Sequence, residues 1–439
     1  MKDGQGLDVT NADAAAIEAL DFLREEWLVF GKRFEGFFAV ADKEESCALL
    51  PVLAANLVLS TNSAEGRALG AKYLARAKAM PAGDARSATW LAATEAWLAG
   101  DSDRSLAIHE TLVEQWPRDL LAGAIGQLHA FNLGASEALL RIGARLAAAQ
   151  PDDPHAGGLH AVALAECHRL DEAEAEARRA LASPSAQHAL VQCLDGRGRP
   201  VEGVSFLKSL GRALPHAEWH LALFLIALDR VDEALALYDA VAEDPLDAVS
   251  LLARLELRGV DVEPRWAALA PRIEPNVHNH FVPVLDLHYL YALARAGRQS
   301  AVTEMLASLE DRAEQAKPFE REAWADCTVP AAHGLAAHAS GDHAEAARLL
   351  GQAMPHLRPI GGSIAQRALF GAIHLDALIK SGWNDAAVKI LQADERERPA
   401  VPATKRALAD LYRKLGRAEQ AMTADWQAER LARQYGSAA

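Results

Sequence analysis

The strongest constraint on this sequence is a recurring pattern of a short polar turn, an alanine-rich segment and a closing proline. The clearest copies run from Ala99 to Pro117, from Leu170 to Pro184, from Val231 to Pro245 and from Ser340 to Pro355. Each copy predicts the second helix of a helical hairpin, because Gly or Asp starts the turn and proline cannot continue a helix. Stacked hairpins extend one core with each added copy, so the pattern favours an elongated helical array.

The copy that ends at Pro184 shows the helical periodicity. Its apolar residues are three and four positions apart and form one stripe: Leu170, Ala173, Ala177 and Leu181. Acidic residues come early on the opposite side and basic residues come late, as the helix dipole favours. The segment therefore predicts an amphipathic helix with one buried face.

The intervals between the closing prolines suggest a repeat class. Pro117 and Pro184 are separated by roughly two units of ~34 residues, the length of a tetratricopeptide repeat. Later intervals differ from that length, so the array is irregular. Alanine and leucine dominate a composition that is 51% hydrophobic and 24% charged. We therefore expect an all-α, tetratricopeptide-like helical-hairpin solenoid.

The hairpins and their interruptions suggest four regions of one continuous solenoid. They are an N-terminal helical region (1–98), a first block of repeats (99–258), a connecting segment (259–283) and C-terminal helical repeats (284–439). The connecting segment is the least regular part of the chain, with four prolines and the run Asn276-Val277-His278-Asn279-His280.

The net charge of −15, from 45 basic and 60 acidic side chains, disfavours binding to nucleic acids or anionic membranes. The four cysteines, Cys47, Cys167, Cys193 and Cys327, are far apart and form no Cys-x-x-Cys pair, which is typical of a reducing compartment. No signal-peptide pattern and no long apolar run is found. We expect a cytoplasmic protein without a cofactor.

His216, Trp219 and His220 form the first group of candidate site residues. Two histidines four residues apart lie on one face of a helix and can chelate zinc, with Asp286 or His288 as a third ligand from another helix. The residue after His216 is Ala217, not the glutamate of the zinc-protease signature. A polar groove without metal and ordinary packing are the alternatives, and we expect no metal.

Asp286 and His288 form the second group. Two residues apart, they point in nearly opposite directions on a helix. Pro283 suits the first helical position, so Asp286 falls in the first turn, where a carboxylate is favoured. His288 shares a side with Val284 and Ala292, which predicts that it is buried.

Gln366 and Arg367 form the third group, after the turn Gly361-Gly362. Ser363 followed three residues later by Gln366 is a capping-box pattern that opens a helix running to Lys380. The alternative is an anion site, in which amides at the helix start and Arg367 hold a carboxylate or phosphate.

Together these motifs resemble the tetratricopeptide repeat protein 38 family. His216-x-x-Trp219-His220-x-Ala222-Leu223 resembles that family's His-Asn-x-Trp-His-x-Ala-Leu, and Asp286-x-His288 resembles its Asp-x-His helix. The segment from Gly361 to Phe370 is similar to its Gly-Gly-Ser-x-Ala-Gln-Arg-Asp-x-Phe. The order of these motifs matches from about Ala99 to Leu378. The resemblance implies a closed-up helical solenoid with an inward-facing polar site.

The sequence departs from that family at several positions. Ala217 and Ala368 replace the family's Asn and Asp, and the family's histidine-rich helix keeps only His188 as histidine. Gln192 and Leu194 replace its other histidines, and Asp195 replaces its glutamate. The departures favour a divergent ligand or a relaxed, non-catalytic site.

Two functions from different classes follow. The first is a binding protein that holds a small polar ligand or a protein or peptide partner in a concave groove lined by histidine and arginine. The alternative is an enzyme for a small polar or anionic substrate, with His216, His220, Asp286 and His288 as acid–base groups and Arg367 orienting the anion. A plain scaffold for an assembly is a third possibility.

Overall fold

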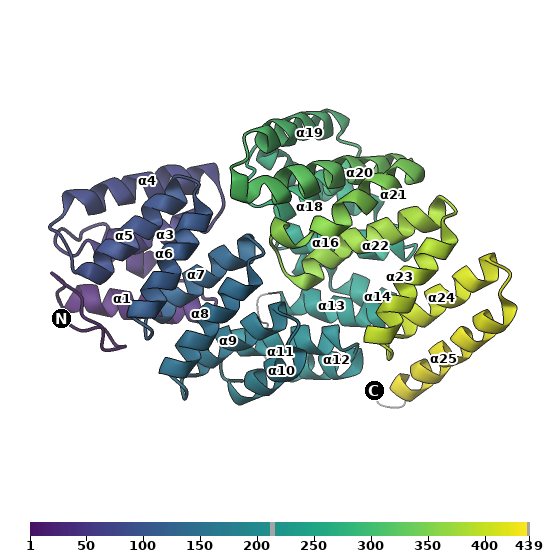
Figure 1. Cartoon of the computed structure of the whole chain (residues 1–439), viewed down its shortest axis with the longest axis horizontal. Helices are drawn as coiled ribbons and strands as arrows, with labels where there is room; N and C mark the ends of the chain where they lie inside the picture. Colours follow the sequence, from purple (N-terminus) through teal and green to yellow (C-terminus); the bar gives the residue numbers. More distant parts are fainter. Residues whose placement is uncertain (211–215, 437–439) are drawn as a thin grey trace. The chain divides into compact units, whose positions relative to one another are not determined.

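The computed structural model describes residues 1–210 and 216–436. In these residues all long regular elements are α-helices, and the one β-type feature is an isolated bridge between Lys2 and Asp8 (Figure 1). This confirms the predicted all-α class of helical hairpins. None of the described helices combines the length and apolarity needed to cross a bilayer.

The chain forms two compact units, Met1–Leu190 and Val191–Ala439. Consecutive helices of the first unit pack against each other, as in a series of hairpins. Its helices are α1 (Ala14–Leu28), α2 (Glu35–Ala41), α3 (Leu49–Leu59), α4 (Ala64–Ala79), α5 (Ala85–Leu98), α6 (Ser102–Gln115), α7 (Leu120–Asn132), α8 (Ser136–Ala149), α9 (Pro154–Glu166), α10 (Leu170–Arg179) and the start of α11 (Pro184–Gly196).

The second unit continues the alternation and adds several short 3-10 turns and a π-helical segment at Glu322–Thr328. Its helices are α12 (Pro200–Ser209), α13 (Ala217–Ala227), α14 (Val231–Ala236), α15 (Tyr238–Val241), α16 (Pro245–Leu257), α17 (Glu263–Ile273), α18 (Pro283–Arg295), α19 (Gln299–Glu314), α20 (Val329–Ser340), α21 (His343–Ala353), α22 (Ile364–Lys380), α23 (Asn384–Glu397), α24 (Pro402–Lys414) and α25 (Ala418–Gly436).

The hairpin turns form as their sequences predict. Gly100 and Gly341 adopt positive φ values of 69° and 87°, which favour glycine. The next residues, Asp101 and Asp342, cap the following helices by accepting hydrogen bonds from backbone amides. Two of the closing prolines, Pro184 and Pro245, are the first residues of the next helix, where proline lacks only an amide that would be unpaired anyway.

Each unit has its own apolar core. In the first unit every residue of α3 is buried, and this helix packs against α2, α4 and α5. In the second unit a core cluster joins α21 to α25, from Ala346 to Ala424. Cys47, Cys193 and Cys327 are buried, as expected for thiols packed as small hydrophobic residues.

The segment 259–283, expected as a connection, contains a packed helix. Within α17, Trp266 is 1% exposed and its ring lies 6.1 Å from that of Tyr291 on α18. Pro264 lies in the first turn of α17 and Pro275 in a 3-10 turn, where proline is tolerated, whereas Pro271 lies inside α17 near its end. The high proline content of this segment therefore does not exclude a helix.

Candidate functional site

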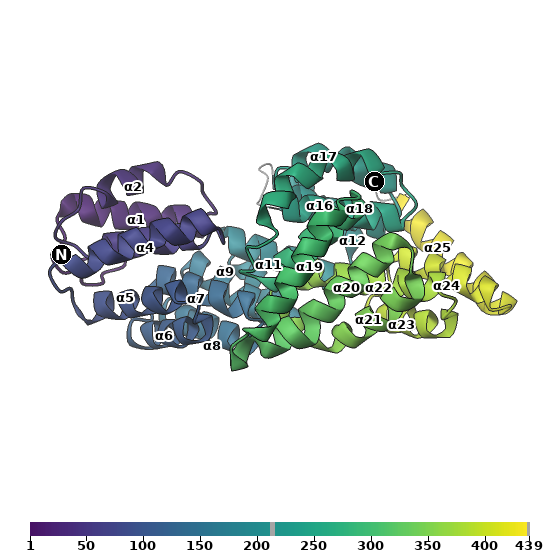
Figure 2. The same ribbon diagram turned by 90° about the horizontal axis from the view of Figure 1, so that it is seen from above.

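Helix α16 lies at the centre of the candidate residues of the second unit. It packs against α13, which follows His216, against α18, which carries Asp286 and His288, and against α22, which carries Gln366 and Arg367 (Figures 1 and 2). Three motifs far apart in sequence are thus joined through one helix. His188 is half-buried on α11, in the first unit.

His216 precedes α13 as its N-cap residue, with a left-handed φ of 61°. The residues directly before it, 211–215, lie outside the described residues. The ring Nδ1 contacts Oδ2 of Asp247 on α16, and the two side chains are 37% and 4% exposed. Desolvation lowers the pKa of His216, but the hydrogen bond and charge of Asp247 outweigh it and raise the pKa overall. Asp247 thus favours the protonated form of His216, while burial raises the pKa of Asp247 itself.

His216 groups with acidic residues rather than with the histidine four residues later. Its ring, Asp244 and Asp247 each offer one ligand atom within 4.8 Å of the others. Where the structure describes the chain, no such three-residue group contains His220, Asp286 or His288. The zinc alternative built on His216 and His220 thus gains no support.

Trp219 and His220 are buried in the first turn of α13. They are 2% and 4% exposed, and their rings lie 4.7 Å apart. The indole Nε1 of Trp219 is buried and has no hydrogen-bond partner among residues 1–210 and 216–436. Buried polar atoms in proteins almost always have a partner, so this donor requires an explanation.

Asp286 lies in the first turn of α18 after Pro283, as predicted. It is 3% exposed, and one carboxylate oxygen lies 2.9 Å from Nδ1 of His280. Nε2 of His280 lies 2.7 Å from the hydroxyl of Ser308. Burial raises the pKa of Asp286, against the opposing effect of His280. The sequence placed His280 in the connecting segment and did not single it out.

His288 is fully buried on α18, as predicted. Its Nδ1 donates to the carbonyl of Val284 at 2.7 Å, and its ring lies 4.9 Å from that of Phe370. Burial, assisted by the charge of Arg254, lowers its pKa to about 3. Its Nε2 is then an acceptor, and it has no partner in the described part of the chain.

Gln366 and Arg367 stabilise the turn that begins α22. Oε1 of Gln366 accepts from the Ser363 amide at 2.8 Å, and the Ser363 hydroxyl accepts from the Gln366 amide at 3.2 Å, which confirms the capping box. The guanidinium of Arg367 donates to the carbonyls of Gly361 and Gly362. These contacts favour the structural interpretation over the anion site for both residues.

Arg254 on α16 is a functional candidate that sequence reasoning missed. Its guanidinium donates to the carbonyl of Ser250 at 3.1 Å, to the Ser250 hydroxyl, and to the carbonyl of Ala365 at 2.6 Å. Burial lowers its pKa to about 10, although the charges of Asp195 and Asp247 oppose this effect. A lone arginine in the apolar run Leu251-Leu252-Ala253-Arg254-Leu255 was the signal available in the sequence.

Several buried polar atoms on α16, on the helices that pack against it, and on Arg398, whose charge acts on Arg254, lack a partner within the described ranges. They are two donors and two acceptors: Trp219 Nε1, Arg398 Nε, Asp247 Oδ1 and His288 Nε2. Arg398 also pairs with Asp195 at 3.3 Å. The cluster formed by Arg254, His216, Asp247, Trp219, His288 and Arg398, here called the Arg254 cluster, can both donate to and accept from a small polar molecule.

Comparison with known proteins adds little to this geometry. No protein-family model matches the sequence. Similar solved structures include the human IFIT1 dimer with PPP-AAAA, at 14% identity over 95% of this chain and 89% of that chain, with a TM-score of 0.38. Another is the TPR domain of P58(IPK), at 14% identity over 80% of this chain and 96% of that chain, with a TM-score of 0.24. Similarity at this level is too low to transfer a ligand or a partner.

Proposed function

We propose that this helical-repeat protein binds a small hydroxylated anion, such as a hydroxycarboxylate, at the Arg254 cluster. The observation that carries the proposal is the environment of Arg254. Its half-buried guanidinium makes its hydrogen bonds to neutral oxygens of Ser250 and Ala365, while Asp195 and Asp247 act on it only through their charge. A buried cation is costly unless an anion compensates it, so an anionic ligand would be favoured here.

The unpartnered atoms of the cluster narrow the ligand class. Trp219 and Arg398 offer donors, which suit carboxylate or phosphate oxygens. His288 Nε2 and Asp247 Oδ1 offer acceptors, which suit a hydroxyl group. A ligand with both an anionic group and a hydroxyl would satisfy all four, and each hydrogen bond to a charged group contributes about 1.5–3 kcal/mol.

The resemblance to the tetratricopeptide repeat protein 38 family supports the same place in the fold. Its three motifs begin α13, α18 and α22, and all three helices pack against α16. Family membership, a cytoplasmic location and a protein or peptide partner remain predictions. A peptide would need polar contacts along an extended surface, whereas the cluster supports a compact ligand.

The test is isothermal titration calorimetry of the full chain with malate, and with succinate as the probe that lacks a hydroxyl. We expect malate to bind and succinate to bind at least tenfold more weakly. Arg254→Met should abolish malate binding while the variant stays folded by circular dichroism. Arg433→Met, a matched change of a 72% exposed arginine on α25, should bind as wild type does. Equal malate affinity in the wild type and Arg254→Met would contradict the proposal.

A second candidate is acid–base catalysis by His216. The pairing of its Nδ1 with the buried carboxylate of Asp247 would orient the ring and keep it protonated, as a general acid requires. Incubation of the protein with a pool of hydroxycarboxylates and sugar phosphates, followed by mass spectrometry, tests this. Catalysis predicts consumption of one compound by the wild type and not by His216→Asn. Binding alone predicts that no compound is consumed.

A further inference from the structure

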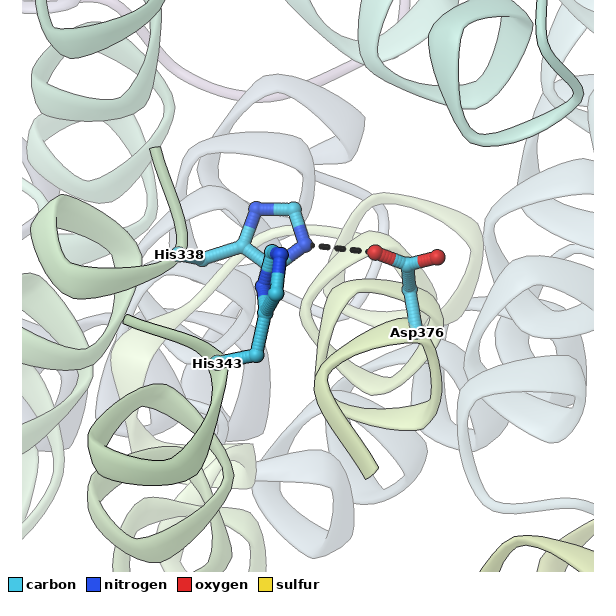
Figure 3. Close-up of side chains that lie close together, drawn as sticks. All are labelled: His338, His343 and Asp376. Atoms are coloured by element: carbon cyan, nitrogen blue, oxygen red, sulfur yellow. Dashed lines mark hydrogen bonds and ion pairs between the residues drawn. The ribbon is translucent and has the colours of Figure 1, made fainter. Parts of the chain in front are cut away.

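A second polar cluster of the second unit lies where α20, α21 and α22 meet. His338 is near the end of α20, His343 is the first residue of α21, and Asp376 is in the last turns of α22 (Figure 3). One ligand atom from each residue lies within 4.8 Å of the other two. The turn Gly341-Asp342 between α20 and α21 brings the two histidines together, and their ring centroids are 5.4 Å apart.

We infer that His338, His343 and Asp376 form a binding site for a divalent transition-metal ion, with zinc as the best-suited ion. Two imidazoles and one carboxylate are a common zinc ligand set, and they leave a fourth position open. At metal–ligand distances of about 2.0–2.2 Å, tetrahedral ligand atoms lie roughly 3–3.5 Å apart. His338 Nε2 and Asp376 Oδ2 are already 2.8 Å apart, so modest side-chain rotations of His343 would complete the site.

The surroundings of His338 match those of a metal ligand. It is 4% exposed, and its second ring nitrogen, Nδ1, lies 3.1 Å from the hydroxyl of Tyr291. Metal-bound histidines typically use the other ring nitrogen for such a hydrogen bond, which fixes the ring orientation. The ring would therefore keep its position when Nε2 releases its hydrogen bond to Asp376 and binds an ion instead.

His343 supplies the second observation that points to a ligand. Its Nδ1 is buried and has no hydrogen-bond partner within residues 1–210 and 216–436. A neutral imidazole with an available lone pair is the form that binds metal.

Lys380 is the competitor for the ion. Its Nζ lies 2.8 Å from Oδ2 of Asp376, one helical turn away on α22, and its side chain is 49% exposed. The ammonium can leave the carboxylate for solvent when an ion arrives, because its side chain already reaches the surface. This gives a prediction that a merely structural cluster does not make, since removing Lys380 should tighten metal binding.

The test uses the full chain, stripped with EDTA and titrated with Co²⁺, whose visible absorption reports tetrahedral coordination, and then with Zn²⁺ in competition. We expect one equivalent of Co²⁺ to bind, at least tenfold more tightly in Lys380→Met. His343→Ala should weaken binding at least tenfold. His333→Ala, a change of an exposed histidine on α20 that contacts Glu310, should bind as wild type does.

His216→Ala is a second control, because His216, Asp244 and Asp247 form the other group of possible metal ligands. Circular dichroism of each variant separates loss of binding from loss of fold, and His343→Ala removes a ring whose Nδ1 has no hydrogen-bond partner among the described residues. Absence of the Co²⁺ absorption from both the wild type and Lys380→Met would overturn the inference. So would a signal that His216→Ala removes and His343→Ala leaves unchanged.

Discussion

The two units of the chain bury histidines in different ways. In the first unit, His109 donates to the carbonyl of Ala122 at 3.0 Å, and His129 lies 3.1 Å from the hydroxyl of Ser105. The rings pack edge-on against Trp90 and Trp97, with centroids 5.1 and 4.5 Å apart. These histidines serve as core residues that are held neutral.

In the second unit His288 is buried against a backbone carbonyl in the same way, but three other histidines each face an aspartate, among them His216, whose side chain is 37% exposed. His280 lies 2.9 Å from Asp286 and His338 lies 2.8 Å from Asp376, and His216 contacts Asp247. A carboxylate beside an imidazole fixes the ring orientation, which sites for ligands and metals commonly use. Burial of a histidine alone therefore does not indicate function, and a buried carboxylate partner or an unpartnered ring nitrogen is needed as well.

The largest expected loss of stability comes from removing a buried ion pair in the core of the first unit. Arg86 pairs with Asp119 at 2.8 Å, their side chains are 8% and 1% exposed, and the indole of Trp90 donates to the same carboxylate. Arg86→Met leaves Asp119 buried without its cation, which should lower the free energy of unfolding by about 3–5 kcal/mol. Urea denaturation followed by tryptophan fluorescence measures it. A loss below about 1 kcal/mol would contradict the account of this core.

Acid should destabilise the first unit through His109. Burial lowers its pKa to about 4, against the opposing effects of the Ala122 hydrogen bond and the charge of Asp119. The folded protein favours neutral His109, so its contribution to the free energy of unfolding is complete above pH ~6.5. This contribution decreases as the pH drops towards 4, by up to about 3 kcal/mol. His109→Gln should flatten this dependence. His288→Gln, the control in the second unit, should leave the acid response of α6 and α7 unchanged in hydrogen exchange.

Packing around His109 can be tested without removing it. A Cβ added at Gly126 would lie 2.9 Å from Cβ of His109 and 3.1 Å from Cδ1 of Ile142. Gly126→Ala should therefore lower the free energy of unfolding by about 1–3 kcal/mol. Gly371→Ala in the second unit is the matched control, since a Cβ there meets nothing within 4 Å. It should stabilise α22 by about 0.5–1 kcal/mol. Equal effects of the two changes in thermal melting would count against the described packing.

The smallest expected effect on stability tests whether Gln366 is a capping residue of α22. Its side chain accepts from the Ser363 amide at the start of α22. Gln366→Ala should lower the free energy of unfolding by about 0.5–1 kcal/mol, measured by urea denaturation, and change malate affinity less than twofold. A large loss of malate binding without a loss of stability would contradict the structural role and indicate that Gln366 contacts the ligand.

The local elements were predictable because their signals are short-range. Helix periodicity, the Gly341-Asp342 turn, the position of Asp286 after Pro283 and the capping box of Gln366 each depend on residues a few positions apart. These features appear in the structure where the sequence placed them. The α17 helix was harder to predict because it contains two prolines, Pro264 in its first turn and Pro271 in its interior.

The site was only partly predictable because its partners are distant in sequence. Asp247 faces His216, and Asp376 faces His338, across hairpins of irregular length. The periodicity of one helix does not predict which residue of a neighbouring helix will contact it. Arg254 was detectable as a single cation in an apolar run, but its neutral hydrogen-bond partner Ala365 lies on α22.

The most direct measurement of the central claim is hydrogen–deuterium exchange of the full chain with and without malate. The account predicts added protection at the start of α13, along α16, in the first turns of α18 and at the start of α22. It predicts no change in α6 and α7, which carry His109 and His129. Protection confined to α6 and α7, or none at saturating malate, would contradict the claim that the ligand site is the Arg254 cluster.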